Sequence, residues 1–350
     1  MTLRIRYGHV AQVALTYAAL MLGAAIVIFP IYLAVVNSLL PKEQAISYPP
    51  KLFPPHPQLG AYKKALESVP LARYMFNSFA QSSVITIGQL ATSVIAAYAF
   101  AFMRFPLRNF LFILFLSTLM VPFEASIIPN FQTVQMMGDP PMGLAVIIAV
   151  LVGVSVGAGV AALLAGVFRG GGTARWRIGA LAVAVLVGAL VGILAGVGAL
   201  RAALDGKILS LDSYQALTIP FLATAFGTFL MRQHFMTIPL ELRDAAAIDG
   251  YGHLRFLWHV VLPLSKPALG TLAVFSYLAA WNQYLWPLLV TNSDNYRTVQ
   301  IGLAGLASQE IDSINVVMAG TVIALLPMLI IIVIFQRQLV RGLMTGAIKG

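Results

Sequence analysis

Few residues in this chain could bind a solute or do chemistry, and the most concentrated group interrupts a long apolar run. It consists of four consecutive side chains, Trp281, Asn282, Gln283 and Tyr284. Aromatic faces next to amide groups suit a polyol or a sugar, which can be stacked on and hydrogen-bonded. Polar contacts between neighbouring membrane helices would explain the same residues, so both interpretations stay open.

A single acidic residue, Glu124, lies within another apolar run beside Pro122. Carboxylates buried in membrane helices usually have a function, because burying them is costly. A place in a solute pathway is therefore one interpretation of Glu124. A side chain that extends to the membrane surface, or one that hydrogen-bonds to another helix, is the other.

Catalytic and metal chemistry have little support in this sequence. It contains no cysteine, which excludes thiol nucleophiles, iron–sulfur clusters and Cys-ligated zinc. Its five histidines show no metal-ligand spacing, and no His, Asp, Glu or Ser cluster has catalytic spacing. No G-x-x-x-x-G-K-[ST] run that would bind ATP is present. We therefore expect no catalytic residue, no metal and no cofactor on this chain, which is not an enzyme.

The elements that position these residues must be membrane helices. Hydrophobic residues make up 59% of the chain and charged residues 10%, whereas soluble domains contain about 25% charged residues. Helices satisfy their own backbone hydrogen bonds in lipid, so we predict an all-α, polytopic membrane protein. The net charge of +10 needs no nucleic-acid partner, because Lys and Arg accumulate on the cytoplasmic side of membrane proteins.

Eight apolar runs are long enough to cross a bilayer. They lie near residues 12–39, 76–102, 109–130, 142–167, 178–200, 211–232, 267–290 and 316–336. With the N-terminus in the cytoplasm, roughly two thirds of the basic residues but only about a quarter of the acidic residues lie inside. We therefore predict that both termini are cytoplasmic.

The chain divides into three parts by composition. Residues 1–138 hold three spans and a Pro-rich outer loop at 40–75, and residues 209–350 hold the remaining core spans. Between them, residues 139–208 form a predicted hairpin of Ala, Val, Gly and Leu, with glycines spaced four residues apart. Such spacing allows helices to approach closely, either within the hairpin or against another membrane subunit.

The largest inner loop, 233–266, is the only inner segment in which acidic residues cluster. Pro239 signals a helix start, and Glu241 and Asp244 lie in or near its first turn, where the helix dipole favours negative charge. Gly250 predicts the helix end, at a position that can adopt a positive φ.

One face of this predicted helix is suited to close contact. Its residues follow i, i+3, i+4, i+7 spacing and are mostly small or apolar: Leu242, Ala245, Ala246 and Asp249. An ordinary amphipathic helix at the membrane surface is the alternative. A second short helix is predicted from about Gly252 to Leu262, ending before Pro263.

The run Glu241-Leu-Arg-Asp-Ala-Ala-Ala-Ile-Asp-Gly250, followed by Leu262-Pro263 and Pro267, resembles the EAA loop of ABC importer permeases. In that family the loop is a coupling helix that sits in a cleft of the ATPase subunit. One departure is Asp244, where the family usually has Glu. The resemblance implies an ATPase-coupling role for the following residues: Glu241, Leu242, Asp244, Ala245, Ala246, Asp249, Gly250, Leu262 and Pro263.

Four further segments resemble the carbohydrate-uptake branch of that family: Arg104–Asn109, Met231–Pro239, Trp281–Leu289 and Arg341–Gly350. The run Trp281–Leu289 looks most like permeases for glycerol-3-phosphate and glycerophosphodiesters. The resemblance covers residues 12–138 and 209–350.

The resemblance implies a type I ABC importer fold, with six core helices plus the inserted hairpin, in a bacterial or archaeal plasma (inner) membrane. The implied partners are a second homologous permease, an ABC ATPase dimer that holds ATP and Mg, and an extracytoplasmic solute-binding protein. The implied solute is glycerol-3-phosphate or a glycerophosphodiester, with a di- or oligosaccharide as the alternative.

An ion-coupled secondary transporter is the competing class. It predicts intramembrane charges in several helices and often inverted repeats. Only Glu124 qualifies as such a charge, and the sequence shows no repeat. An ATP-driven permease therefore remains the preferred hypothesis.

Overall fold

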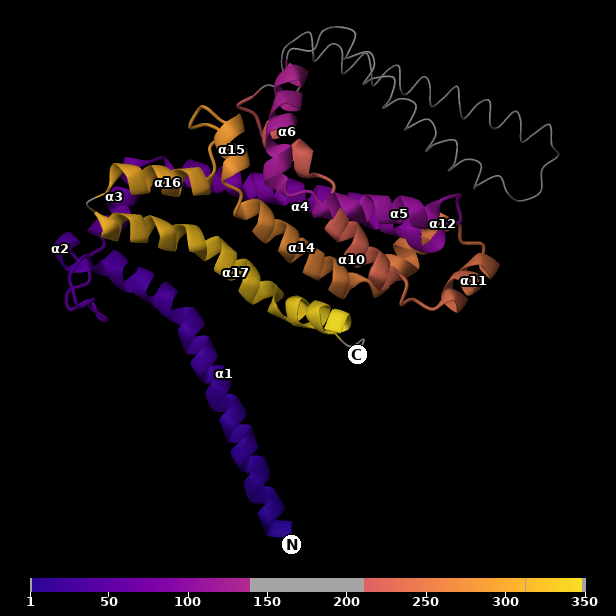
Figure 1. Ribbon diagram of the computed structural model, residues 1–350, viewed down its shortest axis with the longest axis horizontal. Helices are drawn as coiled ribbons and strands as arrows, with labels where there is room; N and C mark the ends of the chain where they lie inside the picture. The colour runs from indigo at the N-terminus through magenta and orange to yellow at the C-terminus, as the bar shows by residue number, and fades with distance from the viewer. Residues whose placement is uncertain (1, 139–210, 312, 348–350) are drawn as a thin grey trace. The chain divides into compact units, whose positions relative to one another are not determined.

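The apolar runs form helices, as lipid requires of a backbone that must satisfy its own hydrogen bonds. The computed structural model describes residues 2–138, 211–311 and 313–347, and within these ranges it contains helices and no strands (Figure 1). The hairpin predicted at 139–208 lies outside the described residues. Three helices are long: α1 (Thr2–Leu39), α4 (Leu71–Phe102) and α17 (Ile314–Ala347).

The chain forms two compact units. The first contains Met1–Phe76 and Thr298–Ile330, and the second contains Asn77–Arg297 and Ile331–Gly350. In the first unit, an ion pair links α3 (Gly60–Ser68) to the residue that follows α16 (Val299–Gln309).

The first unit's ion pair brings Lys64 Nζ to 2.5 Å from Glu310 Oε2, and Ser68 Oγ donates to the other oxygen at 3.2 Å. The hydrogen bond from Lys64 lowers the pKa of the Glu310 carboxyl. A salt bridge supported by a hydroxyl therefore links two segments that lie far apart in sequence.

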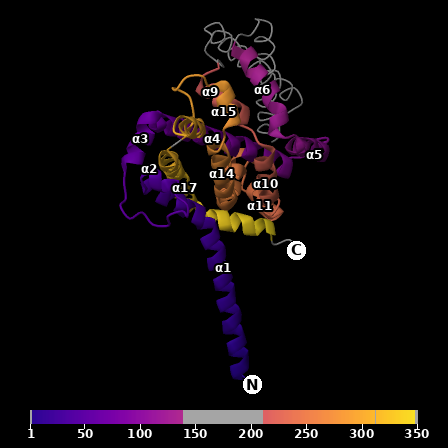
Figure 2. The same cartoon turned by 60° about the vertical axis from the view of Figure 1, so that its left-hand side comes forward.

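The second unit contains the helices around the predicted loop and the polar quartet. Its elements are α5 (Arg108–Ser117), η1 (Thr118–Met120), α6 (Phe123–Gly138), α9 (Tyr214–Thr218), η2 (Ile219–Phe221), α10 (Ala225–Phe235), α11 (Leu240–Ile248), α12 (His253–Phe256), η3 (Leu257–Val261), α13 (Leu262–Leu264), α14 (Lys266–Trp281) and α15 (Leu285–Val290). Helices α10 and α14 lie side by side in both views (Figures 1 and 2). Gly227 of α10 permits this packing, because a Cβ there would collide with Ser93 of α4 and approach Leu272 of α14.

Three single helices in the described ranges are long and apolar enough to cross a membrane: Val10–Leu39, Leu71–Phe102 and Ile314–Arg337. Three bent pairs also qualify if each pair is one span: Arg108–Met120 with Phe123–Gln135, Tyr214–Phe221 with Ala225–Phe235, and His253–Leu264 with Lys266–Trp281. The six spans predicted outside the hairpin therefore have counterparts, but only three of these are unbroken helices.

The predicted span at 109–130 is wrong as a continuous helix. The chain turns by 97° between η1 and α6, and Val121 is extended (ψ 114°) immediately before Pro122. A proline disfavours helical backbone in the preceding residue and has no N–H to donate, so a helix commonly ends at this point.

The predicted span at 267–290 is also interrupted. Helix α14 ends at Trp281, and α15 starts only at Leu285. Pro287 has no N–H that could bond to the carbonyl of Gln283, so a continuous helix through this stretch would lose a hydrogen bond. The polar quartet therefore lies at a break between helices and not in the middle of one.

Candidate functional site

Helix α11 has the boundaries that its local sequence signals predict. It begins after Pro239 (φ −57°, ψ 135°), with Glu241 in its first turn, and its last helical residue is Ile248. Gly250 then adopts φ 78°, the only positive φ among the described glycines. A residue with a Cβ would be strained there, so glycine fixes the direction in which the chain leaves α11.

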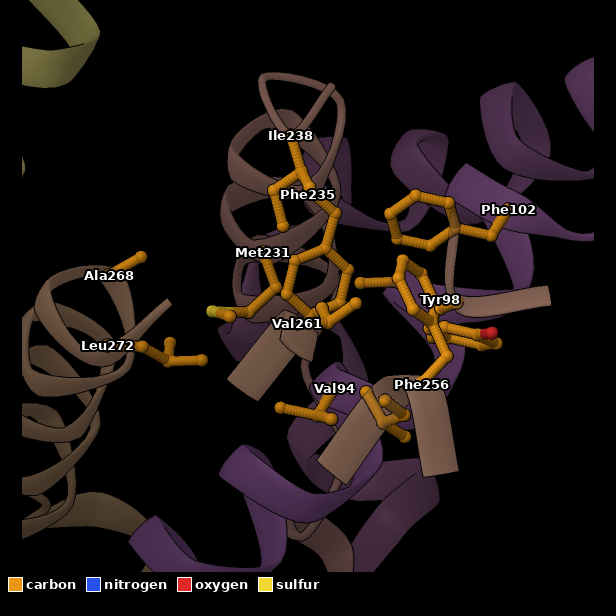
Figure 3. Close-up of a cluster of buried hydrophobic side chains, with 13 residues drawn as sticks. Val94, Tyr98, Phe102, Met231, Phe235, Ile238, Phe256, Val261, Ala268 and Leu272 are labelled. Carbon is orange, nitrogen blue, oxygen red and sulfur yellow. The ribbon is translucent and has the colours of Figure 1, made fainter. Parts of the chain in front are cut away.

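One side of α11 is packed against the rest of the second unit. Ala246 is buried in a hydrophobic cluster, 7% exposed. The cluster draws side chains from several helices, and its buried members are Val94, Ala97, Tyr98, Phe102, Met231, Phe235, Ile238, Ala246, Phe256, Leu257, Val261, Ala268 and Leu272 (Figure 3). Helices α4, α10 and α14 therefore meet α11 and α12 in a single core.

Aromatic rings form the centre of this cluster. The Phe102 ring of α4 meets the Phe256 ring of α12 edge to face, with centroids 5.5 Å apart. It also lies 5.1 Å from Tyr98 and 6.2 Å from Phe235 of α10. Close aromatic pairs contribute about 0.5–1.5 kcal/mol each beyond the burial of their area, so these contacts hold α12 firmly to the two helices.

Two polar contacts fasten the same segment to the end of α4. Tyr98 Oη and His253 Nδ1, at the start of α12, are 2.9 Å apart and share a hydrogen bond. Arg243 Nη1 of α11 donates to the carbonyl of Phe102, the last residue of α4, at 3.4 Å. A cation at a helix C-terminus also favours the helix dipole, so each short helix has its own tie to α4.

The four side chains predicted to share one docking face divide between two environments. Leu242, Ala245 and Asp249 are exposed, whereas Ala246 is buried. Neighbouring residues on a helix are rotated by about 100°, so Ala246 can point into the core while Ala245 points away from it. The exposed side also includes Ile248, which is 87% exposed, and the carboxylates of Glu241 and Asp244.

The segment after α12 differs from its prediction. The helical turns continue through Pro263 to Leu264, past the predicted end at Leu262. A π-helical turn, Leu257–Val261, immediately precedes α13. Such a wider turn gives room for a proline ring, which in a regular α-helix would clash with the carbonyl four residues earlier. Leu262 is partly buried against the cluster, and Pro263 is exposed.

The quartet at Trp281–Tyr284 also divides. Trp281 is 2% exposed and stacks on Tyr277, with centroids 5.9 Å apart. Asn282 Nδ2 donates to the carbonyl of Leu278 at 2.9 Å, and Tyr284 is 39% exposed. Only part of the quartet is therefore available to a solute in this conformation.

Gln283 pairs with a residue that sequence reasoning missed. Its Oε1 accepts a hydrogen bond from Gln81 Nε2 at 2.7 Å. Gln81 belongs to a row of buried polar side chains on α4, here called the α4 polar strip: Asn77, Ser78, Gln81, Ser82, Thr86 and Ser93. Their spacing, mostly of four, five or seven residues within an apolar helix, was the available signal.

Some side chains of the α4 polar strip make hydrogen bonds, and others have buried polar atoms without a partner among the described residues. Asn77 Nδ2 donates to the carbonyls of Asn295 and Arg297, at 2.9 and 2.8 Å. The hydroxyls of Ser82, Thr86 and Ser93 are buried with no hydrogen-bond partner among the described residues. Buried hydroxyls normally have a partner, so these three need a water or a shift of the surrounding helices to be satisfied.

Glu124 lies next to a break between helices, and its place in a solute pathway stays a prediction. It is exposed in the first turn of α6, just after the break at Pro122. Its neighbour Phe123 packs on Trp286 of α15, with ring centroids 6.5 Å apart. Glu124 therefore lies in the part of the unit that contains the α14–α15 break. Among the described residues, no group of three or more His, Asp or Glu could hold a metal ion.

Asp212 fastens the segment that leads into α9. It adopts φ 67°, and its Oδ1 accepts hydrogen bonds from the backbone N–H groups of Asn292 and Ser293, both at 2.9 Å. Burial raises the pKa of this carboxyl, but the hydrogen bonds outweigh burial and the pKa is lowered. Tyr214, two residues on, donates to Asn77 Oδ1 at 2.6 Å, which ties this segment to the α4 polar strip.

Comparison with known proteins gives consistent matches along the chain. A model of the family described as "Binding-protein-dependent transport system inner membrane component" matches residues 89–345. The sn-glycerol-3-phosphate transport system permease protein UgpE of Yersinia enterocolitica is 31% identical over 335 residues, covering 93% of this chain and 94% of that protein. UgpE of Escherichia coli O1:K1 is 31% identical over 336 residues, covering 94% of each chain.

A solved structure supports the fold. It is a bacterial ABC transporter involved in the import of the acidic polysaccharide alginate, and it matches with a TM-score of 0.61 at 20% identity. The match covers 93% of this chain and 95% of that one. At this level of identity the match establishes the architecture and not the solute.

The burial of Ala246 generates a prediction about stability. Ala246→Leu would force extra volume into the aromatic cluster, and overpacking of this kind costs about 1–3 kcal/mol. Ala245→Leu, one residue away on the exposed side, should change the free energy of unfolding by less than about 0.5 kcal/mol. Thermal unfolding of the two purified variants in detergent tests this, and equal midpoints would show that Ala246 is not packed in the cluster.

Proposed function

The chain belongs to the family of binding-protein-dependent transport system inner membrane components, and on this premise we propose that α11 is the element by which an ATPase moves it. The chain is a permease subunit of an ABC importer and has no ATP site of its own. Its part in transport is therefore mechanical. When the ATPase moves one surface of the permease, that movement has to open or close a solute pathway in another part of the chain.

The observation that carries this proposal is the division of α11 into a buried and an exposed side. Ala246 is in the cluster, while Leu242, Ala245 and Asp249 are exposed. An ATPase surface that contacts the exposed side would displace α11 together with the helices that share its core. Small side chains such as Ala245 allow a partner's groove to come close, and Asp249 offers a carboxylate at the C-terminal end of the helix.

The proposed movement passes through the cluster to α4, α10 and α14. A packed core has discrete arrangements and does not deform continuously, so displacement of α11 would move these helices as bodies. The α4 polar strip and the break at Asn282–Tyr284 lie further along the same helices. When the ATPase pair closes and opens, a solute would thus reach this polar region first from one side of the membrane and then from the other.

The proposed assembly follows from this mechanism. A second homologous permease completes the pathway, an ABC ATPase dimer binds ATP and Mg, and an extracytoplasmic binding protein delivers the solute. Both termini and the loop 233–266 would face the cytoplasm of a bacterial or archaeal cell. Residues 1–138 and 209–350 would form the shared core, and 139–208 an added membrane hairpin.

For the solute, we infer sn-glycerol-3-phosphate or a glycerophosphodiester, with a di- or oligosaccharide as the alternative. The named relatives transport sn-glycerol-3-phosphate, and the buried hydroxyls and amides of α4 suit the glycerol part. A phosphate also needs a cation. Arg297, whose carbonyl accepts from Asn77, pairs with Asp294 through Nη1 at 3.3 Å, while its buried Nε has no hydrogen-bond partner among the described residues.

If α11 couples the ATPase to transport, substitutions on its exposed side should impair transport without lowering stability. Asp249→Lys and Ala245→Leu should leave the thermal midpoint unchanged but weaken binding of the ATPase about tenfold or more, equal to about 1.4 kcal/mol, with a matching loss of uptake. Co-purification of the ATPase and solute uptake by reconstituted vesicles measure these effects. Lys63→Gln, a change at an exposed residue of α3, is the control, and normal ATPase binding by both loop variants would refute the coupling role.

The solute proposal predicts selective uptake that depends on Arg297. Vesicles carrying the complete transporter and its binding protein should take up sn-glycerol-3-phosphate, with competition by a glycerophosphodiester and none by maltose. Arg297→Gln should raise the KM about tenfold, because a charge-assisted contact to phosphate is lost. Uptake of maltose with no uptake of glycerol-3-phosphate would favour the sugar alternative while leaving the coupling role intact.

A further inference from the structure

Two arginines lie close together where α5 begins and α10 ends. The guanidinium carbon of Arg232 is 4.0 Å from the centre of the Phe112 ring, and Arg108 is one helical turn before Phe112 on the same face of α5. Helices α5 and α10 are in contact. Arg232 thus reaches the face of α5 that carries Arg108, and both side chains are positive.

Neither arginine has an acidic partner in the ranges that the structure describes, where the ion pairs are Lys63–Glu67, Lys64–Glu310 and Arg297–Asp294. Both bond to backbone carbonyls: Arg232 Nε donates to Phe100 at 3.3 Å, and Arg108 Nη1 donates to Met103 at 3.2 Å. These bonds fix the side chains in place without neutralising them. A bound anion would neutralise the two guanidinium groups.

An exposed apolar surface lies on the neighbouring side of α5. Four side chains of α5 and its preceding residue follow i, i+3, i+4, i+7 spacing and are all exposed: Leu107, Phe110, Leu111 and Leu114. This set is here called the α5 stripe. It runs from the arginine end of α5 along the helix, so a molecule bound by its charged end at Arg108 would find apolar side chains along its length.

The position of the pair along the spans is informative as well. Arg108 is the first residue of the bent pair Arg108–Met120 with Phe123–Gln135, and Arg232 lies in the last turn of the pair that ends at Phe235. Both residues therefore lie at span ends, where lipid headgroups are found. The charged site and the apolar stripe have the order that a phospholipid has, headgroup first and acyl chain inward.

We propose that Arg108 and Arg232 bind the phosphate of an anionic phospholipid whose acyl chain lies along the α5 stripe. A soluble phosphate compound shares the headgroup chemistry, but it makes no use of the four exposed apolar side chains, which favour the lipid. In the proposed orientation the lipid belongs to the cytoplasmic leaflet. Binding would relieve the repulsion between the arginines and so stabilise the contact of α5 with α10, which carries Met231 and Phe235 of the aromatic cluster.

The test titrates phosphatidylglycerol against the purified complete transporter in detergent and measures the bound lipid by native mass spectrometry. Arg108→Gln should weaken binding about fivefold and Arg108→Gln with Arg232→Gln about 25-fold, since each basic residue near an anionic surface contributes about 1 kcal/mol. Arg232→Lys should retain most of the affinity. Arg337→Gln, a change at an exposed arginine near the end of another candidate span, should have no effect.

Two comparison arms identify the ligand class. Phosphatidylcholine, whose headgroup has no net charge, should bind all variants equally weakly, and millimolar sn-glycerol-3-phosphate should not displace phosphatidylglycerol. Leu111→Asn should weaken lipid binding with both arginines present. Unchanged phosphatidylglycerol affinity in Arg108→Gln would overturn the proposal, and so would displacement by sn-glycerol-3-phosphate, which would indicate a soluble-anion site. Size-exclusion profiles verify that each variant is folded.

Discussion

The packing of Phe102 against Phe256 and Phe235 is the contact on which the rest of the second unit depends. It joins the end of α4, the start of the segment after α11 and the end of α10 in one buried core. Burying an aromatic side chain contributes about 1.5–3 kcal/mol, so separating these three elements would be costly. Because Ala246 packs into the same core, α11 is part of this body and not a flexible loop beside it.

The broken spans pose the opposite problem, since non-helical backbone at membrane depth must find partners inside the protein. Helix α4 supplies several of them. Gln89 Nε2 and Thr92 Oγ1 donate to the carbonyls of Phe221 and Leu222, which lie at the break before α10, at 2.9 and 2.8 Å. Gln81 meets Gln283 at the break after α14. One unbroken polar-edged helix thus supports two interrupted ones.

Local signals in the sequence predicted local structure well. The start of α11 after Pro239 and its end before Gly250 follow from the backbone preferences of proline and glycine, which act within a few residues. The interruptions at Pro122 and Asn282 were missed because the apolar window that identifies a span averages over about 20 residues. The prolines themselves were visible, and giving them more weight would have placed the first break.

The burial and pairing of the site residues depend on tertiary packing, which local sequence signals do not reveal. Helical spacing placed Ala245 and Ala246 on one face, but which of the two is buried depends on Phe102 and Phe256, which are brought there only by tertiary packing. Gln81 could not be paired with Gln283 from sequence for the same reason, because 202 residues separate them. The EAA-like pattern predicts the function of the segment, and the structure adds the buried core in which α11 and α4 pack together.

The central claim is that α11 and α4 move as one body, and a distance between them tests it most directly. The chain has no cysteine, so spin labels can be placed at Glu241→Cys in α11 and Ile95→Cys in α4, both exposed positions. Pulsed electron paramagnetic resonance on the complete transporter, with and without ATP, measures the distance between the labels. The account predicts one unchanged distribution in both states; a shift of several ångströms on adding ATP would contradict it.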